Sequence, residues 1–184
     1  MKGLLEKIND SSRKLRCGES MNEKSTPIPM DKLLQNVVAA HSAAKPKPEL
    51  EILDDGLVVQ ANWTRLARVI GHRIQNAIEA TPKDGQVQVR LSGQEDAAVV
   101  EVKDTGHGMS EEFIRDRLFK PFDSTKPAGM GIGVFEIREY VIELQGRLEV
   151  ISQPSNGTTF RVVLPLHSQG RLLRNPYSVS RGTR

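Results

Sequence analysis

The sequence has a single cysteine, few aromatic residues and no long apolar run. Cys17 cannot form an internal disulfide and belongs to no zinc-binding cluster, which fits a reducing cytosol. Aromatic residues make up 4% of the 184, so we expect an aliphatic core. No apolar stretch approaches the roughly 18 residues that span a bilayer, and no signal-peptide pattern follows Met1. These absences predict a cytoplasmic chain.

Acidic residues are missing from the last stretch, residues 167–184, which carries Arg171, Arg174, Arg181 and Arg184. The net charge of +3 is therefore partly an effect of this stretch rather than of a basic folded face. A nucleic-acid-binding module usually gathers its cations on such a face. We therefore expect no nucleic-acid partner and a flexible basic tail over 167–184.

The remaining chain has the length of one domain, preceded by two short segments. Apolar residues near heptad spacing predict the end of an amphipathic helix over residues 1–17. Glycine, prolines and small polar residues then predict a linker over 18–29. The domain itself is expected at 30–166.

Hydrophobic periodicity inside this domain alternates between helical and strand patterns. Helices are predicted after Asp31 as an N-cap, from Asn62 to the "ATPKDG" turn, from Ser110 through Leu118, and from Gly131 to Gln145 with Gly146 as the C′ residue. Alternating apolar residues predict two hairpins, one around "SGQEDA" and one around "QPSNG", besides two short strands before Asn62. This order predicts an α+β fold, a two-layer sandwich with a mixed, mainly antiparallel sheet.

His72, Asn76 and Glu79 share one stripe of the helix that follows Asn62, almost opposite its apolar face. A solvent-facing stripe would be polar as well, so the pattern alone does not require a function. The carboxamide oxygen of Asn76 is nevertheless a suitable ligand for Mg²⁺, which usually completes its shell with water and substrate phosphates.

Two glycine-rich segments follow. In "DTGHGM" an aspartate ends a strand, where Asp104 could accept a hydrogen bond from an exocyclic amine, and Gly106 and Gly108 would allow a flat ring to approach the backbone. An ordinary turn capped by the aspartate explains the same letters. "GMGIG", from Gly129, opens a helix whose free N–H groups could bind phosphate. Neither a dinucleotide fold nor a P-loop fits, because no strand precedes this run and no Gly-Lys-Ser/Thr ends it.

Between them lies "LFKPFDSTKPAG", where Lys126 could reach a phosphate as a point charge, although a surface lysine is an equally good interpretation.

Taken in this order, the segments resemble the ATP-binding domain of sensor histidine kinases, in the superfamily shared with gyrase, Hsp90 and MutL. The resemblance covers residues 30–166 and implies the Bergerat ATP-binding fold. "HRIQNAIEAT" resembles the N box, "DTGHGM" the G1 box, "LFKPF" the F box, "GMGIG" the G2 box and "NGTTF" a late Gly-Thr segment. It implies a metal ligand at Asn76, catalytic roles for Asn76, His72 and Lys126, and nucleotide-binding roles for Asp104, Gly106, Gly108, Met109, Phe122, Thr125, Gly129, Gly131, Ile132, Gly133 and Thr158.

The implied activity is transfer of the γ-phosphoryl group of Mg-ATP to a histidine on a dimeric helical hairpin, and from there to a response regulator. The parent kinase is then expected to be a homodimer, with membrane anchoring left open. The short lid and "QNAIEATP" look most like kinases of PEP-CTERM exopolysaccharide and sorting systems, and a little like nitrogen-regulatory kinases.

The sequence departs from the family pattern at three points. His72 stands where many of these kinases have a second Asn and gyrase-type members a glutamate that activates water, which favours phosphotransfer over hydrolysis. Glu79 replaces a phosphate-directed lysine, so Lys126 would have to supply the cation. No phosphoacceptor histidine in an N-terminal hairpin is present, so the acceptor would act in trans. An anti-sigma-factor type serine kinase and a non-catalytic nucleotide-sensing module remain alternatives.

Overall fold

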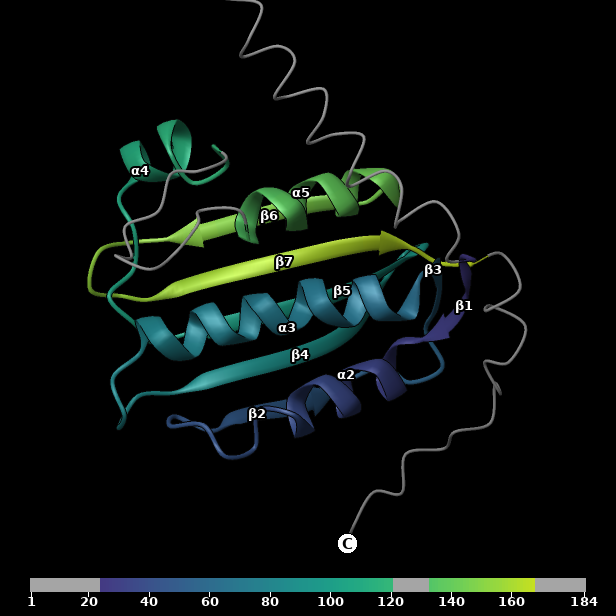
Figure 1. The fold of residues 1–184 in the computed structure, drawn as a ribbon, viewed down its shortest axis with the longest axis horizontal. Helices are drawn as coiled ribbons and strands as arrows, with labels where there is room; N and C mark the ends of the chain where they lie inside the picture. Colours follow the sequence, from purple (N-terminus) through teal and green to yellow (C-terminus); the bar gives the residue numbers. More distant parts are fainter. Residues whose placement is uncertain (1–23, 121–132, 168–184) are drawn as a thin grey trace, which may run out of the picture.

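The computed structural model describes residues 24–120 and 133–167, which form a layer of helices on one face of a sheet (Figure 1). The helices are α2 (Met30–Ala39), α3 (Trp63–Ala80), α4 (Glu111–Asp116) and α5 (Gly133–Glu143). The strands are β1 (Thr26–Pro29), β2 (Pro48–Ile52), β3 (Val58–Ala61), β4 (Val87–Gln94), β5 (Ala97–Asp104), β6 (Arg147–Ser152) and β7 (Thr158–Pro165).

The main sheet has five strands in the order β2-β4-β5-β7-β6. Only β2 and β4 are parallel, while the pairs β4-β5, β5-β7 and β6-β7 are antiparallel. A separate two-stranded sheet joins β1 to β3. Both predicted hairpins are present, and the expectation of a two-layer α+β fold with a mixed, mainly antiparallel sheet is confirmed.

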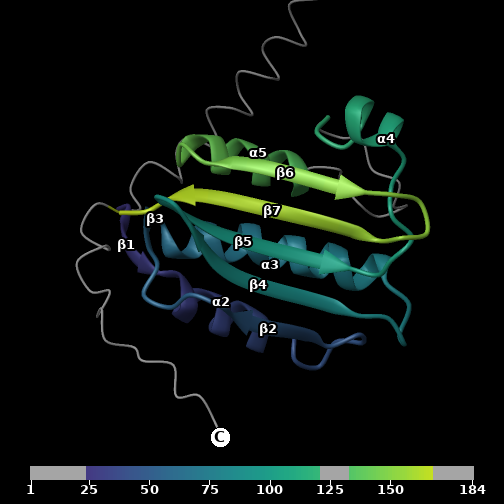
Figure 2. The ribbon, with the colours of Figure 1, turned by 180° about the vertical axis from the view of Figure 1, so that it is seen from behind.

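Alternation along the strands decides which face the helices cover. Val89 and Val100 are completely buried, while Arg90 and Glu101 next to them lie on the opposite face. Figure 2 shows that none of the helices α2, α3, α4 and α5 covers that opposite face. Across the core, α3 presents its own apolar stripe, which includes Leu66, Ile70, Ile74 and Ala77. The buried hydrophobic residues of the described ranges are aliphatic except Tyr140 and Phe160, as the low aromatic content predicts.

The first helix begins differently from the expectation. Asp31 does not cap it; Pro29 is the N-cap residue, no side chain caps the helix, and the Met30 N–H donates to the Leu57 carbonyl at 2.9 Å. The prediction of a linker over 18–29 is wrong for its last four residues, which form β1. Ile28, 1% exposed, pairs with Val59 there, so burial of one apolar side chain turns the proline-flanked segment into a strand.

The end of α5 also corrects a prediction. The left-handed C′ position is taken by Gln145, whose φ is 58°, and not by Gly146. The Gln145 N–H bonds to the Ile142 carbonyl at 2.9 Å and the Gly146 N–H to the Val141 carbonyl at 2.8 Å, which is the Schellman pattern. Gly146 is required for close approach, since a Cβ there would collide with the Val163 carbonyl oxygen.

Three other elements agree with expectation or lie outside the described residues. The Asn62 side chain caps α3 by accepting the Arg65 N–H at 2.9 Å, and Ser110 caps α4 by accepting that of Phe113 at 3.2 Å, although α4 ends at Asp116 instead of Leu118. The expected helix over 1–17 and the tail beyond His167 fall outside, and His167 itself donates its N–H to the Val58 carbonyl at 2.8 Å. Over the described ranges, no helix has the length and apolarity that crossing a membrane requires.

Candidate nucleotide-binding site

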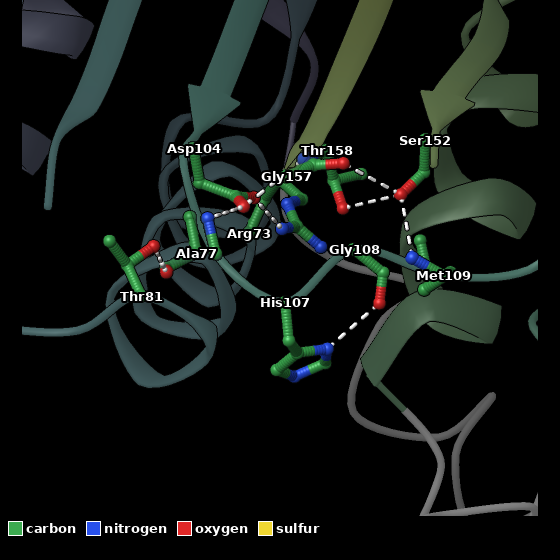
Figure 3. Close-up of polar contacts among 11 residues, drawn as sticks. Arg73, Ala77, Thr81, Asp104, His107, Gly108, Met109, Ser152, Gly157 and Thr158 are labelled. Atoms are coloured by element: carbon green, nitrogen blue, oxygen red, sulfur yellow. Dashed lines mark hydrogen bonds and ion pairs between the residues drawn. The ribbon is translucent and has the colours of Figure 1, made fainter. Parts of the chain in front are cut away.

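Asp104 is the last residue of β5 and is 2% exposed. Its Oδ1 accepts the N–H of Gly106 at 3.0 Å and the N–H of Thr158, the first residue of β7, at 3.1 Å (Figure 3). Two backbone donors on one oxygen fix the orientation of the carboxylate. An aspartate that only capped a solvent-facing turn would not need this burial, so the geometry favours a binding role over a simple turn.

The loop after Asp104 is packed too closely for side chains at its glycines. A Cβ on Gly106 would collide with the Ala80 carbonyl oxygen, and one on Gly108, whose φ is 65°, with the Gln153 carbonyl oxygen. Gly157, with φ 78°, would collide in the same way with the carbonyl of Asp104. Glycine at 106, 108 and 157 therefore holds the loop against α3 on one side and the β6-β7 turn on the other.

Ser152, at the end of β6, ties this loop to the neighbouring hairpin. Its Oγ accepts the Met109 N–H at 2.8 Å, donates to the Gly157 carbonyl at 2.9 Å and lies 2.9 Å from the Thr158 hydroxyl (Figure 3). Since its one proton goes to Gly157, the Thr158 hydroxyl is the donor of that last bond. Sequence patterns did not single out Ser152, because a serine at the end of a strand has no distinctive pattern.

The helix α3 reaches the same loop at its C-terminal end, where the His107 N–H donates to the Ala80 carbonyl at 3.2 Å. Asn76 lies one turn before Ala80 and is half-buried, whereas His72 and Glu79 are exposed. Glu79 accepts a hydrogen bond from Gln75 at 2.8 Å. The structure thus puts Asn76 within one helical turn of the Asp104 loop and leaves His72 a further turn away.

A residue that the sequence patterns did not single out also contacts Asp104. Arg73 on α3 is 6% exposed, and its Nη2 lies 3.5 Å from Asp104 Oδ2. Its Cζ stands 3.9 Å from the centre of the Phe160 ring on β7. Burial lowers the pKa of Arg73 to about 10, against the opposing attraction of Asp104. One sequence feature could have identified Arg73: it falls on the same stripe of α3 as Ile70, Ile74 and Ala77, where an apolar residue is expected.

The remaining predicted site residues are Lys126, Phe122, Thr125, Gly129, Gly131 and Ile132, which lie outside the described residues; Gly133 begins α5. Over the described ranges, no cluster of three or more His, Cys, Asp or Glu could hold a metal ion. A metal bound near Asn76 would therefore take most of its ligands from a substrate or from water, which suits Mg²⁺ with a nucleotide and not a structural zinc ion.

Comparison with known proteins identifies a family and several similar proteins. Residues 61–168 match the family model described as histidine kinase-, DNA gyrase B-, and HSP90-like ATPase. Sporulation kinase C of Bacillus subtilis is 32% identical over 82% of this chain and 33% of its own length. The C4-dicarboxylate transport sensor protein DctB of Rhizobium meliloti is 38% identical over 62% of this chain and 18% of its own length. The catalytic domain of histidine kinase ThkA superimposes with a TM-score of 0.70 at 26% identity, covering 80% of this chain and 99% of that one. The chain thus spans a third or less of these two curated relatives.

Proposed function

Because this chain belongs to the family of histidine kinase-, DNA gyrase B-, and HSP90-like ATPases, we propose that residues 30–166 are the ATP-binding catalytic domain of a two-component sensor histidine kinase. The observation that carries the proposal is the buried Asp104 at the end of β5, held by two backbone N–H groups. The finer resemblance to kinases of PEP-CTERM systems stays a prediction.

Recognition of adenine is proposed for Asp104 and the glycine loop. One carboxylate oxygen is occupied by Gly106 and Thr158, so the other can accept a proton of the exocyclic amine of adenine. Gly106 lets the backbone approach the ring where a side chain would collide with Ala80. Met109 and Thr158, both joined to Ser152, would line the same end of the sheet.

Phosphate and metal binding is proposed for α3 and for the glycine-rich segment before α5. Asn76 would give Mg²⁺ one neutral oxygen ligand, and the bound metal would neutralise phosphate charge. Gly129, Gly131, Ile132 and Gly133 would offer backbone N–H groups to the phosphates, and Lys126 a cation. His72 would orient water or contact phosphate. The protein's part in phosphoryl transfer would be to position the groups and to offset their charge.

The phosphoacceptor is proposed to be a histidine on the dimerisation domain of the parent kinase, with a response regulator as the later partner. Of the histidines in the described ranges, His41 bonds its Nδ1 to the Val37 carbonyl at 2.8 Å on α2, and His107 bonds its own to the Gly108 carbonyl at 2.8 Å. His72 lies on α3, which packs on the sheet, and His167 follows β7. None of these four histidines lies on a hairpin of two helices, which supports an acceptor outside the described residues. The parent kinase would act as a homodimer.

Binding of a non-hydrolysable ATP analogue tests the proposal. We expect Mg²⁺-dependent binding to the wild type, and a loss of about tenfold or more in both Asn76→Ala and Asp104→Asn. Gln75→Ala, an exposed amide on the same helix, is the matched control and should bind as the wild type does. Absence of binding by a folded wild type in millimolar Mg²⁺ would contradict the proposal, in favour of a module without a nucleotide site.

Supplying a separate histidine hairpin then tests the chemistry. We expect an acid-labile phosphoryl group on the hairpin in the presence of Mg-ATP. An acid-stable product on an antagonist-type protein would instead indicate the serine kinase alternative.

A further inference from the structure

Arg73 is a cation inside the apolar layer between α3 and the sheet. Its helix neighbours Ile70, Ile74 and Ala77 are at most 1% exposed, and Arg73 itself is 6% exposed. Burying a charged side chain is costly unless it is paired and hydrogen-bonded. A simple packing role at this position would be served better by an aliphatic residue, so the arginine needs another explanation.

The contacts of Arg73 satisfy it only in part. Its Nη2 contacts Asp104 Oδ2 at 3.5 Å, which is long for a charge-assisted hydrogen bond. The guanidinium also lies over the Phe160 ring at 3.9 Å, a cation–π contact. Its Nε is buried and has no hydrogen-bond partner within residues 24–120 and 133–167. Arg73 is thus held beside Asp104 at the cost of an unsatisfied donor.

The two oxygens of Asp104 have different surroundings. Oδ1 accepts two backbone N–H groups, from Gly106 and Thr158. Across the described part of the chain, Oδ2 receives only the long contact from Arg73. A carboxylate oxygen accepts more than one hydrogen bond, so Oδ2 keeps room for a donor from a ligand.

We propose that Arg73 is a specificity-determining positioning residue, which acts through Asp104 to make the 6-amino group of a purine necessary for tight binding. The inference rests on the proposed nucleotide site. The guanidinium holds Oδ2 in place before the ligand arrives, so less ordering remains to be done on binding.

A comparison of two nucleotides on four variants tests the inference. The ligands are ATP and purine riboside triphosphate, which differ by the 6-amino group, and affinity is measured by calorimetry on the full chain. We expect the wild type to prefer ATP by about 10- to 100-fold, the range for a hydrogen bond to a charged group. Arg73→Leu and Arg73→Gln remove the charge and should reduce the preference to within about threefold, while Arg73→Lys, which keeps the charge, should retain most of it.

The matched control is Arg90→Leu, the same change on the open face of the sheet, where Arg90 pairs with Glu51 at 2.8 Å. It should leave the preference unchanged. Thermal unfolding checks that each variant folds, and Arg73→Gln keeps the test available if Arg73→Leu does not fold.

The outcomes separate the two levels of the proposal. If the wild type prefers ATP and the charge-free variants prefer it equally strongly, Arg73 only fills space and this inference alone is wrong. If the folded wild type binds both nucleotides equally well, recognition of the amino group by Asp104 is wrong and this inference fails with it, while nucleotide binding as such stands. If it binds neither nucleotide, the proposed function fails as well.

Discussion

The two faces of the sheet use ion pairs in opposite ways. On the helix-covered face, one pair of charges, Arg73 and Asp104, is almost completely buried at 3.5 Å. On the open face, five charged residues stand in one row across all five strands, with alternating sign. The first arrangement has few charges and a large desolvation cost, and the second has many charges that remain partly hydrated.

The open row is set by strand register. Glu51 pairs with Arg90, Arg90 with Glu101, Glu101 with Arg161, and Arg161 with Glu149, each pair being direct neighbours on adjacent strands. The outer ion pairs, Arg90–Glu51 and Arg161–Glu149, are 2.8 Å long, and the two that involve Glu101 are 3.7 Å. Side chains of this row are between 23% and 42% exposed, so each pair contributes little.

The comparison shows that the number of ion pairs on a face does not indicate how much the loss of one partner would destabilise the protein. Partly exposed pairs favour the correct strand register and are weakened by salt. A buried pair adds little net stability, but losing one partner leaves a charge that nothing compensates. A costly buried pair beside the proposed nucleotide site is therefore better explained by recognition than by folding.

The largest effect is expected for Asp104→Ala, which leaves the Arg73 charge buried and alone. The free energy of unfolding should fall by about 3–5 kcal/mol, measured by chemical denaturation. Lys103→Ala, at the exposed neighbouring position on β5, is the control and should change it by less than about 0.5 kcal/mol. A loss below about 1 kcal/mol for Asp104→Ala would mean that water reaches Arg73 and that the two faces do not differ as described.

A smaller effect is expected for Glu101→Lys in the middle of the open row. The change replaces two attractive pairs by repulsion from Arg90 and Arg161, at a cost of about 1–2 kcal/mol at low salt. Raising NaCl to about 1 M should remove most of this loss, because the Debye length falls to about 3 Å, but should not restore Asp104→Ala. Glu49→Lys, an exposed position on β2, is the control. Equal salt sensitivity of Asp104→Ala and Glu101→Lys would contradict the difference between the buried pair and the open row.

The smallest effect is expected for Glu149→Gln, and it should depend on pH. The pKa of Glu149 is lowered from 4.5, first by the hydrogen bond from Arg147 and then also by Arg161, against burial. A carboxyl group whose pKa is lowered on folding stabilises the folded protein at pH values above its pKa in the unfolded chain. This contribution is lost as the pH falls through its pKa in the folded protein. The free energy of unfolding of Glu149→Gln should therefore be lower than that of the wild type by up to about 1 kcal/mol at pH 7. The two should become equal at a pH below the pKa of Glu149 in the folded protein, as measured by chemical denaturation at a series of pH values. A deficit that persists in acid would assign the loss to packing.

Much of the fold was predictable because local signals and burial agree. The Asn62 cap, the apolar stripe of α3 and both hairpins follow from short-range patterns that the structure keeps. The errors occurred where a distant segment decided the outcome. The end of the expected linker forms β1 because it pairs with β3. Position 146 requires glycine because β7 approaches its backbone too closely for a Cβ.

The candidate site was predictable in part for the same reason. Asp104, Gly106 and Asn76 stand in recognisable motifs, and their proposed roles await the binding experiments above. Arg73 and Ser152 belong to no motif, and their importance appears only when α3, β5 and β6 come together. No local pattern indicates that an arginine on an apolar stripe will meet an aspartate 31 positions later.

Local sequence was enough to predict the main helices, both hairpins, the aliphatic core and the motifs that carry the family resemblance, because helix and strand periodicity and glycine chemistry act over a few residues. Contacts between distant segments decided that residues 26–29 form a strand, and also which charges are buried and which stay hydrated. That depends on strand order and on which face the helices cover, and these are set by contacts between residues far apart in the chain. The same arginine–carboxylate chemistry therefore becomes a costly buried pair at Arg73 and a weak surface row at Arg90.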